Sequence, residues 1–241
     1  GVFRVTDGLV DKYGAKRVMD SPLAESGLVG TAMGMAVNGL KPVVEIQFSG
    51  FFLQGFDQFV SHLTRIRNRT RGELGAQVVI RMPYCGGIRA LEHHSESQEA
   101  MFAHIPGCKI VIPATPSAAK GLLLASIEDP DPVIFMEPKK LYRAFKEDVK
   151  DDYFTTQLGK ARKVSDGDDI TVVCYGAMAK VCADAAEYAK EKKIGCDVID
   201  LQTVWPMDID AVIESVKRTG KLLIVHEGVR TAVSPPRSRR S

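Results

Sequence analysis

Residues 109–136 read KIVIPATPSAAKGLLLASIEDPDPVIFM, and this stretch decides the fold class of the chain. It opens and closes on short apolar runs, at 109–112 and 132–136, whose length is typical of buried strands. Between them, residues 116–127 place apolar side chains at helical spacing. Thr115 precedes this segment as a candidate cap, with Pro116 at the first helical position, where a missing N–H does no harm. A strand, a helix and a second strand in this order indicate an α/β fold.

The same alternation continues on both sides of this stretch. Further strand candidates lie at 42–46, 77–81, 170–175, 196–199 and 222–225. Further helix candidates lie at 27–38, 53–67, 97–104, 177–190 and 208–217, the last with Asp208 as its cap. Strands that alternate with helices predict a mainly parallel sheet with helices on both faces.

A polar and charged stretch without clear periodicity interrupts this alternation between residues 145 and 160. Such a composition is typical of a linker, and the strand–helix order resumes after it. We therefore predict a first domain at 1–145, a linker at 146–160 and a second domain at 161–241.

The overall composition is that of an ordinary globular protein, with 45% hydrophobic and 26% charged residues. The formal net charge is +2, so the sequence predicts no nucleic-acid partner and no membrane partner. No apolar run approaches the roughly 18 residues that span a bilayer. The five cysteines are odd in number and form no C-x-x-C pair, which favours plain core thiols in a reducing compartment over disulfides or a zinc site.

Several polar or small residues stand where helices begin. Glu25 lies just before the helix expected at 27–38, where a carboxylate is favoured by the helix dipole. Gly27, Gly30 and Gly34 share one face of that helix. Two explanations remain open for these glycines, namely close packing on the sheet or close packing against a helix of another subunit.

Two loops carry residues suited to binding or catalysis. The segment 45–52, EIQFSGFF, follows a strand, and its aromatics form either core or the wall of a pocket at the strand's carboxyl end. The loop 92–97, EHHSES, contains adjacent histidines, which suit acid–base chemistry better than shared metal binding. The alternative is a solvated loop in which Ser95 or Ser97 caps the next helix.

Four segments together carry a resemblance to a known family. They are SPLAESG at 21–27, EIQFSGFFLQGFD at 45–57, HHS at 93–95 and EPKKLYR at 137–143. In this order they resemble the beta chains of E1 components of 2-oxo acid dehydrogenases, and the likeness runs from the first residue to about Ala232. The resemblance implies a thiamine-diphosphate pyrimidine-binding domain followed by an incomplete transketolase C-terminal-like α/β domain.

The resemblance also implies roles for individual residues. Glu25 matches the glutamate that hydrogen-bonds ring nitrogen N1′ of the cofactor's aminopyrimidine and favours its imino tautomer. Phe51 matches the aromatic packed on that ring, and Gln47 matches a nearby contact. His94 matches the histidine that handles protons as the acyl group passes to a lipoyl arm, and His93 is its neighbour in the sequence.

The cofactor and partners implied by the family extend beyond this chain. An E1 alpha chain, in an α2β2 heterotetramer, would hold the diphosphate and Mg²⁺, for which no Gly-Asp-Gly…Asn motif exists here. A lipoyl-bearing E2 acyltransferase would accept the acyl group. A potassium ion is expected on backbone carbonyls at Val78, Ser126, Asp129 and Asp131, although Asp129-Pro130-Asp131-Pro132 is also a plain turn sequence.

Finer expectations concern the substrate, the location and the ends of the chain. MPYCGG at 82–87 and EPKKLYR look most like the branched-chain 2-oxo acid enzymes. The alternatives are a pyruvate or acetoin dehydrogenase E1 beta chain, or a non-catalytic assembly subunit. The expected location is the cytoplasm, or the mitochondrial matrix in a eukaryote. The family has residues before Gly1, and VSPPRSRRS at 233–241 departs from it, which predicts a truncated or frame-shifted chain that is prone to association.

Overall fold

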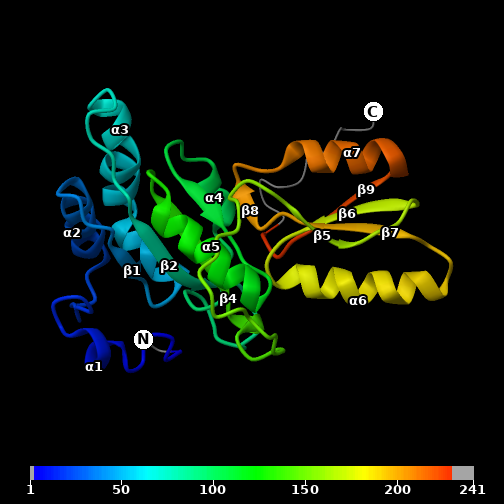
Figure 1. Ribbon diagram of the computed structural model, residues 1–241, viewed down its shortest axis with the longest axis horizontal. Helices are drawn as coiled ribbons and strands as arrows, with labels where there is room; N and C mark the ends of the chain where they lie inside the picture. Colours follow the sequence, from blue (N-terminus) through cyan, green and yellow to red (C-terminus); the bar gives the residue numbers. More distant parts are fainter. Residues whose placement is uncertain (1–2, 230–241) are drawn as a thin grey trace.

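The computed structural model describes residues 3–229, and the divergent segment 233–241 lies outside the described residues. Two sheets, each with its own helices, lie side by side along the long axis of the molecule (Figure 1). Strands alternate with helices along most of the chain, so the prediction of an α/β fold is confirmed.

The first sheet has five strands in the order β1-β2-β4-β3-β8. Four are parallel and come from the part of the chain before the segment 146–160: β1 (Val43–Glu45), β2 (Val79–Tyr84), β3 (Lys109–Val111) and β4 (Val133–Pro138). The fifth, β8 (Thr203–Trp205), arrives from the second half of the chain and pairs antiparallel with β3. A strand from beyond the segment 146–160 therefore completes the sheet formed by the residues before it.

Alternating side chains bury both faces of this sheet. In β4, Val133 and Phe135 face one core with Leu122 of α5 (Pro116–Glu128), whereas Ile134 and Met136 face the other. That second core is covered by α2 (Glu25–Val37) and α4 (Glu99–Ala103). Thr115 caps α5 as predicted, because its hydroxyl accepts a hydrogen bond from Ala118 N at 3.2 Å.

The prediction of one continuous helix at 53–67 is wrong. The chain instead forms a 3₁₀ helix η1 (Ser49–Gly55), a π turn η2 (Gln58–His62), a second 3₁₀ turn η3 (Leu63–Arg65) and α3 (Ile66–Arg69). Three buried rings lie here edge to face, with centroids 5.6 Å apart for Phe52–Phe59 and 5.5 Å for Phe52–Phe102. Changes of helical pitch alter the directions in which the side chains of this segment point. These side chains can therefore pack into the core in an arrangement that an unbroken α-helix does not allow.

The second sheet has the order β5-β7-β6-β9. Its strands are β5 (Arg162–Ser165), β6 (Ile170–Cys174), β7 (Cys196–Asp200) and β9 (Leu222–Val225), and only β5 is antiparallel to its neighbour. Figure 1 shows α6 (Ala177–Glu191) on one face and α7 (Ile209–Thr219) on the other. Asp208 caps α7 as predicted, through Ala211 N at 3.5 Å.

The connecting segment 146–160 contains no helix or strand. It is nevertheless attached to the first domain, because Thr156 N donates to Gly121 O at 3.0 Å and a side chain on Gly121 would collide with Thr156 and Phe154. At the seam, Ala177 is buried in the core of the first sheet. Short elements missed by periodicity are α1 (Leu9–Tyr13), η4 (Lys139–Leu141), β5 and β8.

The five cysteines are free thiols, and four of them are buried, in line with the prediction of plain core residues. Among residues 3–229, no helix is long and apolar enough to cross a bilayer.

Candidate functional site

Functional side chains gather at the carboxyl end of β1, where open α/β sheets bind ligands. Gln47 and Phe48 lie between the end of β1 at Glu45 and the start of η1 at Ser49. The N-terminus of α2 and the histidine loop 92–97 both contact η1, so this short 3₁₀ helix joins two segments that lie far apart in the sequence.

Glu25 is the first residue of α2 and is only 5% exposed. Two contacts hold this helix start against η1. The Ser26 hydroxyl donates to Gln54 O, and a Cβ built on Gly55 would lie 3.0 Å from Glu25 O. Within the described residues, no hydrogen bond or ion pair reaches the Glu25 carboxylate. A buried carboxylate without a partner is costly, so this group is suited to a ligand that supplies one.

The second part of the site is an aromatic cluster formed by Phe48, Phe51, His93 and His94. The Phe51 ring lies 5.2 Å from His94 and 6.2 Å from His93, and Phe48 lies 4.6 Å from His94. Gly50 makes this approach possible, because a Cβ there would come within 2.3 Å of His93 O. These rings present flat surfaces on which a planar ligand packs well.

The proton positions on His94 follow from its neighbours. His94 Nδ1 lies 3.2 Å from Glu92 O, and since a carbonyl only accepts, Nδ1 carries the proton. In the neutral ring Nε2 is then the free acceptor. The loop is held by Ser95, whose hydroxyl donates to Ala90 O at 2.7 Å, and by His93 N, which donates to Glu96 Oε1 at 3.2 Å.

One of the alternatives for this loop is wrong. Ser95 and Ser97 do not cap the next helix, since Gln98 stands at the cap of α4 with no side-chain hydrogen bond. No group of three or more His, Cys, Asp or Glu side chains suited to a metal ion occurs in the described part of the chain. Gln47 is half-buried beside the cluster, at the end of β1.

The glycine face of α2 is largely open. Gly27 and Gly34 are exposed, and a Cβ on Gly34 would meet nothing within 4 Å. The opposite face, with Val29, Ala32 and Ala36, is the one that packs in the core. Packing on the sheet therefore does not explain Gly34, and close packing against another subunit stays a prediction.

The residues expected to bind potassium lie at the opposite, amino-terminal edge of the first sheet. Val78 O accepts from Val133 N at 2.9 Å, and Ser126 lies in the last turn of α5. Asp129 accepts from Lys109 Nζ at 2.6 Å, and Asp131 pairs with Arg67 at 2.5 Å. Protein cations thus bind both carboxylates, and the potassium site on the carbonyls remains a prediction.

A buried ion network near the site was missed by sequence reasoning. Arg81 in β2 bonds Glu137 at 2.5 Å and Glu45 at 3.0 Å, and Tyr142 donates to Glu137 at 2.5 Å. Burial disfavours the charge of Arg81, but the two carboxylates more than offset it and raise its pKa. The only signal in the sequence was a charged residue inside each of three apolar strands.

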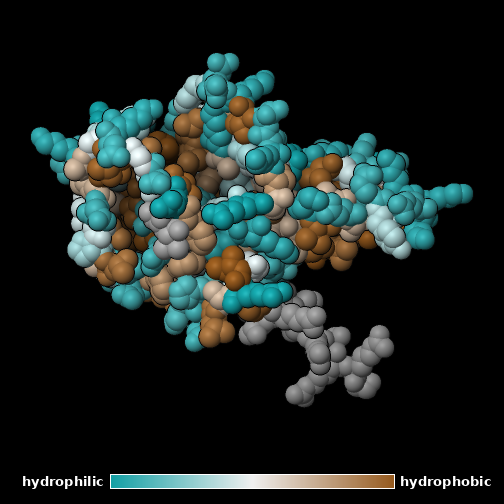
Figure 2. Space-filling model, turned by 90° about the horizontal axis from the view of Figure 1, so that it is seen from below, coloured by the Kyte–Doolittle hydropathy of each residue, from teal (hydrophilic) through white to brown (hydrophobic). Residues whose placement is uncertain are grey.

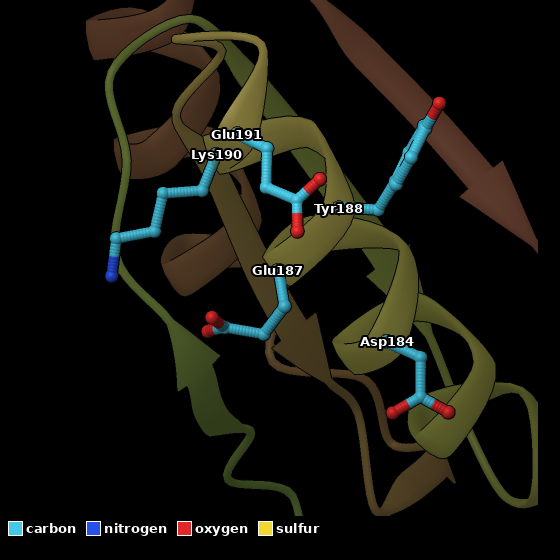
Figure 3. A pocket seen from close by; sticks show the side chains of 5 residues that line it. All are labelled: Asp184, Glu187, Tyr188, Lys190 and Glu191. Carbon is cyan, nitrogen blue, oxygen red and sulfur yellow. The ribbon is translucent and has the colours of Figure 1, made fainter.

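The surface of the second domain carries a separate hollow beside α6, away from these residues. Figure 3 shows Asp184, Glu187, Tyr188, Lys190 and Glu191 around it, spreading from the last turns of the helix. They form an ordinary charged, solvated helix face.

Comparison with known proteins defines the class. The family model described as transketolase, pyrimidine binding domain, matches residues 1–144, and the transketolase C-terminal domain matches residues 159–233. A solved structure described as a split gene transketolase, inactive beta4 tetramer, aligns over 85% of this chain and 63% of its own, with TM-score 0.71 and 21% identity. The fold and the matched models define a transketolase-like α/β protein.

Curated relatives narrow this class. Proteins named pyruvate dehydrogenase E1 component subunit beta are 51% identical in Acholeplasma laidlawii, 50% in Mycoplasma genitalium and 45% in Staphylococcus aureus. Each alignment covers 96% of this chain and 71% of the relative. The chain belongs to the E1 beta-subunit family of the 2-oxo acid dehydrogenases.

Proposed function

We propose that this chain is the beta subunit of a pyruvate dehydrogenase E1 component that works with an E1 alpha subunit and thiamine diphosphate. The relatives at 45–51% identity all bear the pyruvate name, which favours this alternative over the branched-chain interpretation. These relatives are bacterial, which agrees with a cytoplasmic location.

The observation that carries the catalytic part of the proposal is the placement of Glu25 and His94 at the two ends of η1. The buried Glu25 carboxyl would hydrogen-bond a pyrimidine ring nitrogen, and Phe51 would pack on the ring face. Gln47 would supply a further polar contact. Bound thiamine diphosphate supplies the electron sink for loss of CO2 from a 2-oxo acid.

The protein's own contribution is positioning and proton handling. Glu25 is mostly buried, and the reduced polarity around it strengthens a hydrogen bond made at its carboxyl. His94 Nε2 accepts or returns a proton as the acyl group leaves for a lipoyl-bearing E2 acyltransferase, while Glu92 O fixes the tautomer. Mg²⁺ and the diphosphate are assigned to the alpha subunit.

The surface around the site supports a partner there. Leu23 and Leu91, next in sequence to the site segments, are each 78% exposed. Figure 2 shows that hydrophobic areas lie between hydrophilic side chains on one face of the molecule. Exposed apolar side chains of this size favour an interface with another subunit, for which we propose the E1 alpha chain.

The test is co-expression with an alpha chain and a decarboxylation assay with thiamine diphosphate and Mg²⁺. Pyruvate should be turned over with a higher kcat/KM than 3-methyl-2-oxobutanoate. The reverse order would restore the branched-chain interpretation. Activity that survives intact in a Glu25→Gln complex would instead indicate a non-catalytic assembly subunit.

A further inference from the structure

Lys139 is a mostly buried lysine for which residues 3–229 provide no hydrogen-bonding partner. It is the first residue of η4, directly after β4, and is 4% exposed. Within residues 3–229, no hydrogen bond or ion pair reaches its Nζ. A buried ammonium is costly unless it is paired, so its survival at this position requires a compensating contact.

The ammonium faces the aromatic cluster of the site. Lys139 Nζ lies 5.6 Å from the centroid of the Phe48 ring, within the range of a cation–π contact. Phe48 in turn lies 4.6 Å from His94 and 5.8 Å from Phe51. One ring therefore separates the charge of Lys139 from the proposed acid–base residue.

The surrounding groups leave this charge only partly compensated. Burial lowers the pKa of Lys139 to about 8, while the nearby Cys85 and Glu227 oppose that change. Glu227 forms no ion pair with it among the described residues. The side chain is thus mainly cationic at neutral pH, and no anion within residues 3–229 lies at hydrogen-bonding distance from it.

We propose that Lys139 is a specificity-determining residue that binds the carboxylate of the 2-oxo acid substrate. The inference rests on the proposed function and adds to it a residue of this chain that recognises the anion. The carboxylate would take the place beside Phe48, where it gives the ammonium its missing partner. The neighbouring His94 then lies close to the carbon that the carboxylate leaves.

Kinetics of the assembled complex test the proposal. Loss of a charge-assisted hydrogen bond in Lys139→Met should raise KM for pyruvate about ten- to a hundredfold. Because CO2 carries no charge, the cation stabilises substrate more than transition state, and kcat should not fall. Lys139→Arg should recover most of the affinity, and Lys140→Met, at the exposed neighbouring lysine, should behave as wild type.

A chemical readout tests the same contact without turnover. Brief treatment of the wild-type complex with acetic anhydride should acetylate Lys139, since its lowered pKa leaves more neutral amine at pH 7.5. Oxamate, a non-reacting anion of similar shape, should protect Lys139, and neutral acetamide should not. Protection can be read by peptide mass spectrometry even if the Met variant does not assemble.

Two different results distinguish failure of the inference about Lys139 from failure of the proposed function. A wild-type complex that decarboxylates pyruvate, with unchanged KM in Lys139→Met or no protection by oxamate, overturns the inference and leaves the proposed function standing. A wild-type complex that decarboxylates no 2-oxo acid overturns the proposed function, and the inference falls with it.

Discussion

Gly55 and Glu25 are in backbone contact: a Cβ on Gly55 would lie 3.0 Å from Glu25 O and 3.2 Å from Glu25 Cβ. Ordinary carbon contacts are about 3.5–4.0 Å, so an added methyl group must push the start of α2 away from η1. The absence of a side chain at Gly55 therefore sets the position of the buried carboxylate.

Gly55→Ala should displace Glu25 and weaken the site. Overpacking at such a contact costs about 1–3 kcal/mol of folding free energy. We expect a lower thermal midpoint, together with decarboxylation activity that falls further than the loss of folded protein explains. Unchanged activity and midpoint would show that the contact is not a constraint.

Glu25→Gln should remove most of the activity with little effect on folding. An amide keeps the size of the carboxyl but cannot exchange a proton with a pyrimidine nitrogen, and proton-transfer groups contribute about 10²–10⁴-fold. Decarboxylation should drop by about a hundredfold or more while size-exclusion chromatography shows normal assembly. Glu73→Gln, at an exposed glutamate, is the matched control.

Gly34→Ala should separate helix stability from subunit packing. Since Gly34 is exposed and its Cβ would meet nothing, alanine should stabilise the isolated chain by up to about 1 kcal/mol. If the face packs against another subunit, the same methyl group should weaken assembly with the alpha chain, which a binding titration measures. Equal affinity for both forms would exclude this face from the interface.

The seam between the two domains should respond to pH through Glu99. Burial raises the pKa of this 2%-exposed carboxyl, although Tyr175 OH donates to Glu99 Oε1 at 2.8 Å. Its ionisation therefore opposes folding. The penalty is absent below the unfolded pKa of about 4.3 and grows as pH rises through the raised folded value.

Glu99→Gln should remove this dependence. Its free energy of unfolding, measured with urea between pH 4 and pH 8, should fall less with rising pH than that of the wild type. If the free energy of unfolding changed with pH in the same way for both proteins, the pKa of Glu99 would not differ between the folded and unfolded states.

The edge strand β9 should make the chain self-associate. Three consecutive apolar side chains of β9 are exposed: Leu222 by 47%, Leu223 by 47% and Ile224 by 60%. Because successive side chains point to opposite faces of a strand, both faces of β9 carry exposed apolar surface. Such an edge is a template for pairing with another chain. Leu223→Thr with Ile224→Thr should lower the weight-average mass in analytical ultracentrifugation, and equal masses would place the association elsewhere.

Local signals in the sequence predicted the elements well where periodicity was strong. The bounds of β9 were matched at both ends, and the caps Thr115 and Asp208 act as expected, because each depends on neighbouring residues alone. The broken helix η1–α3 was missed, since its pitch is set by rings packed against Phe102, far along the chain. Strand β8 was missed because its pairing with β3 is a long-range contact.

The sequence by itself determined the α/β class, because the periodicity of helices and strands can be read from neighbouring residues. It also named Glu25, Phe51 and His94, because the order of the motifs can be read without a structure. Only the tertiary structure decided that η1 holds Glu25 at one end and His93 at the other, through glycines that permit backbone contact. It also decided that the Lys139 ammonium lies against the Phe48 ring. Such relationships depend on distances between segments remote in the chain, and those distances are set by packing of the whole core.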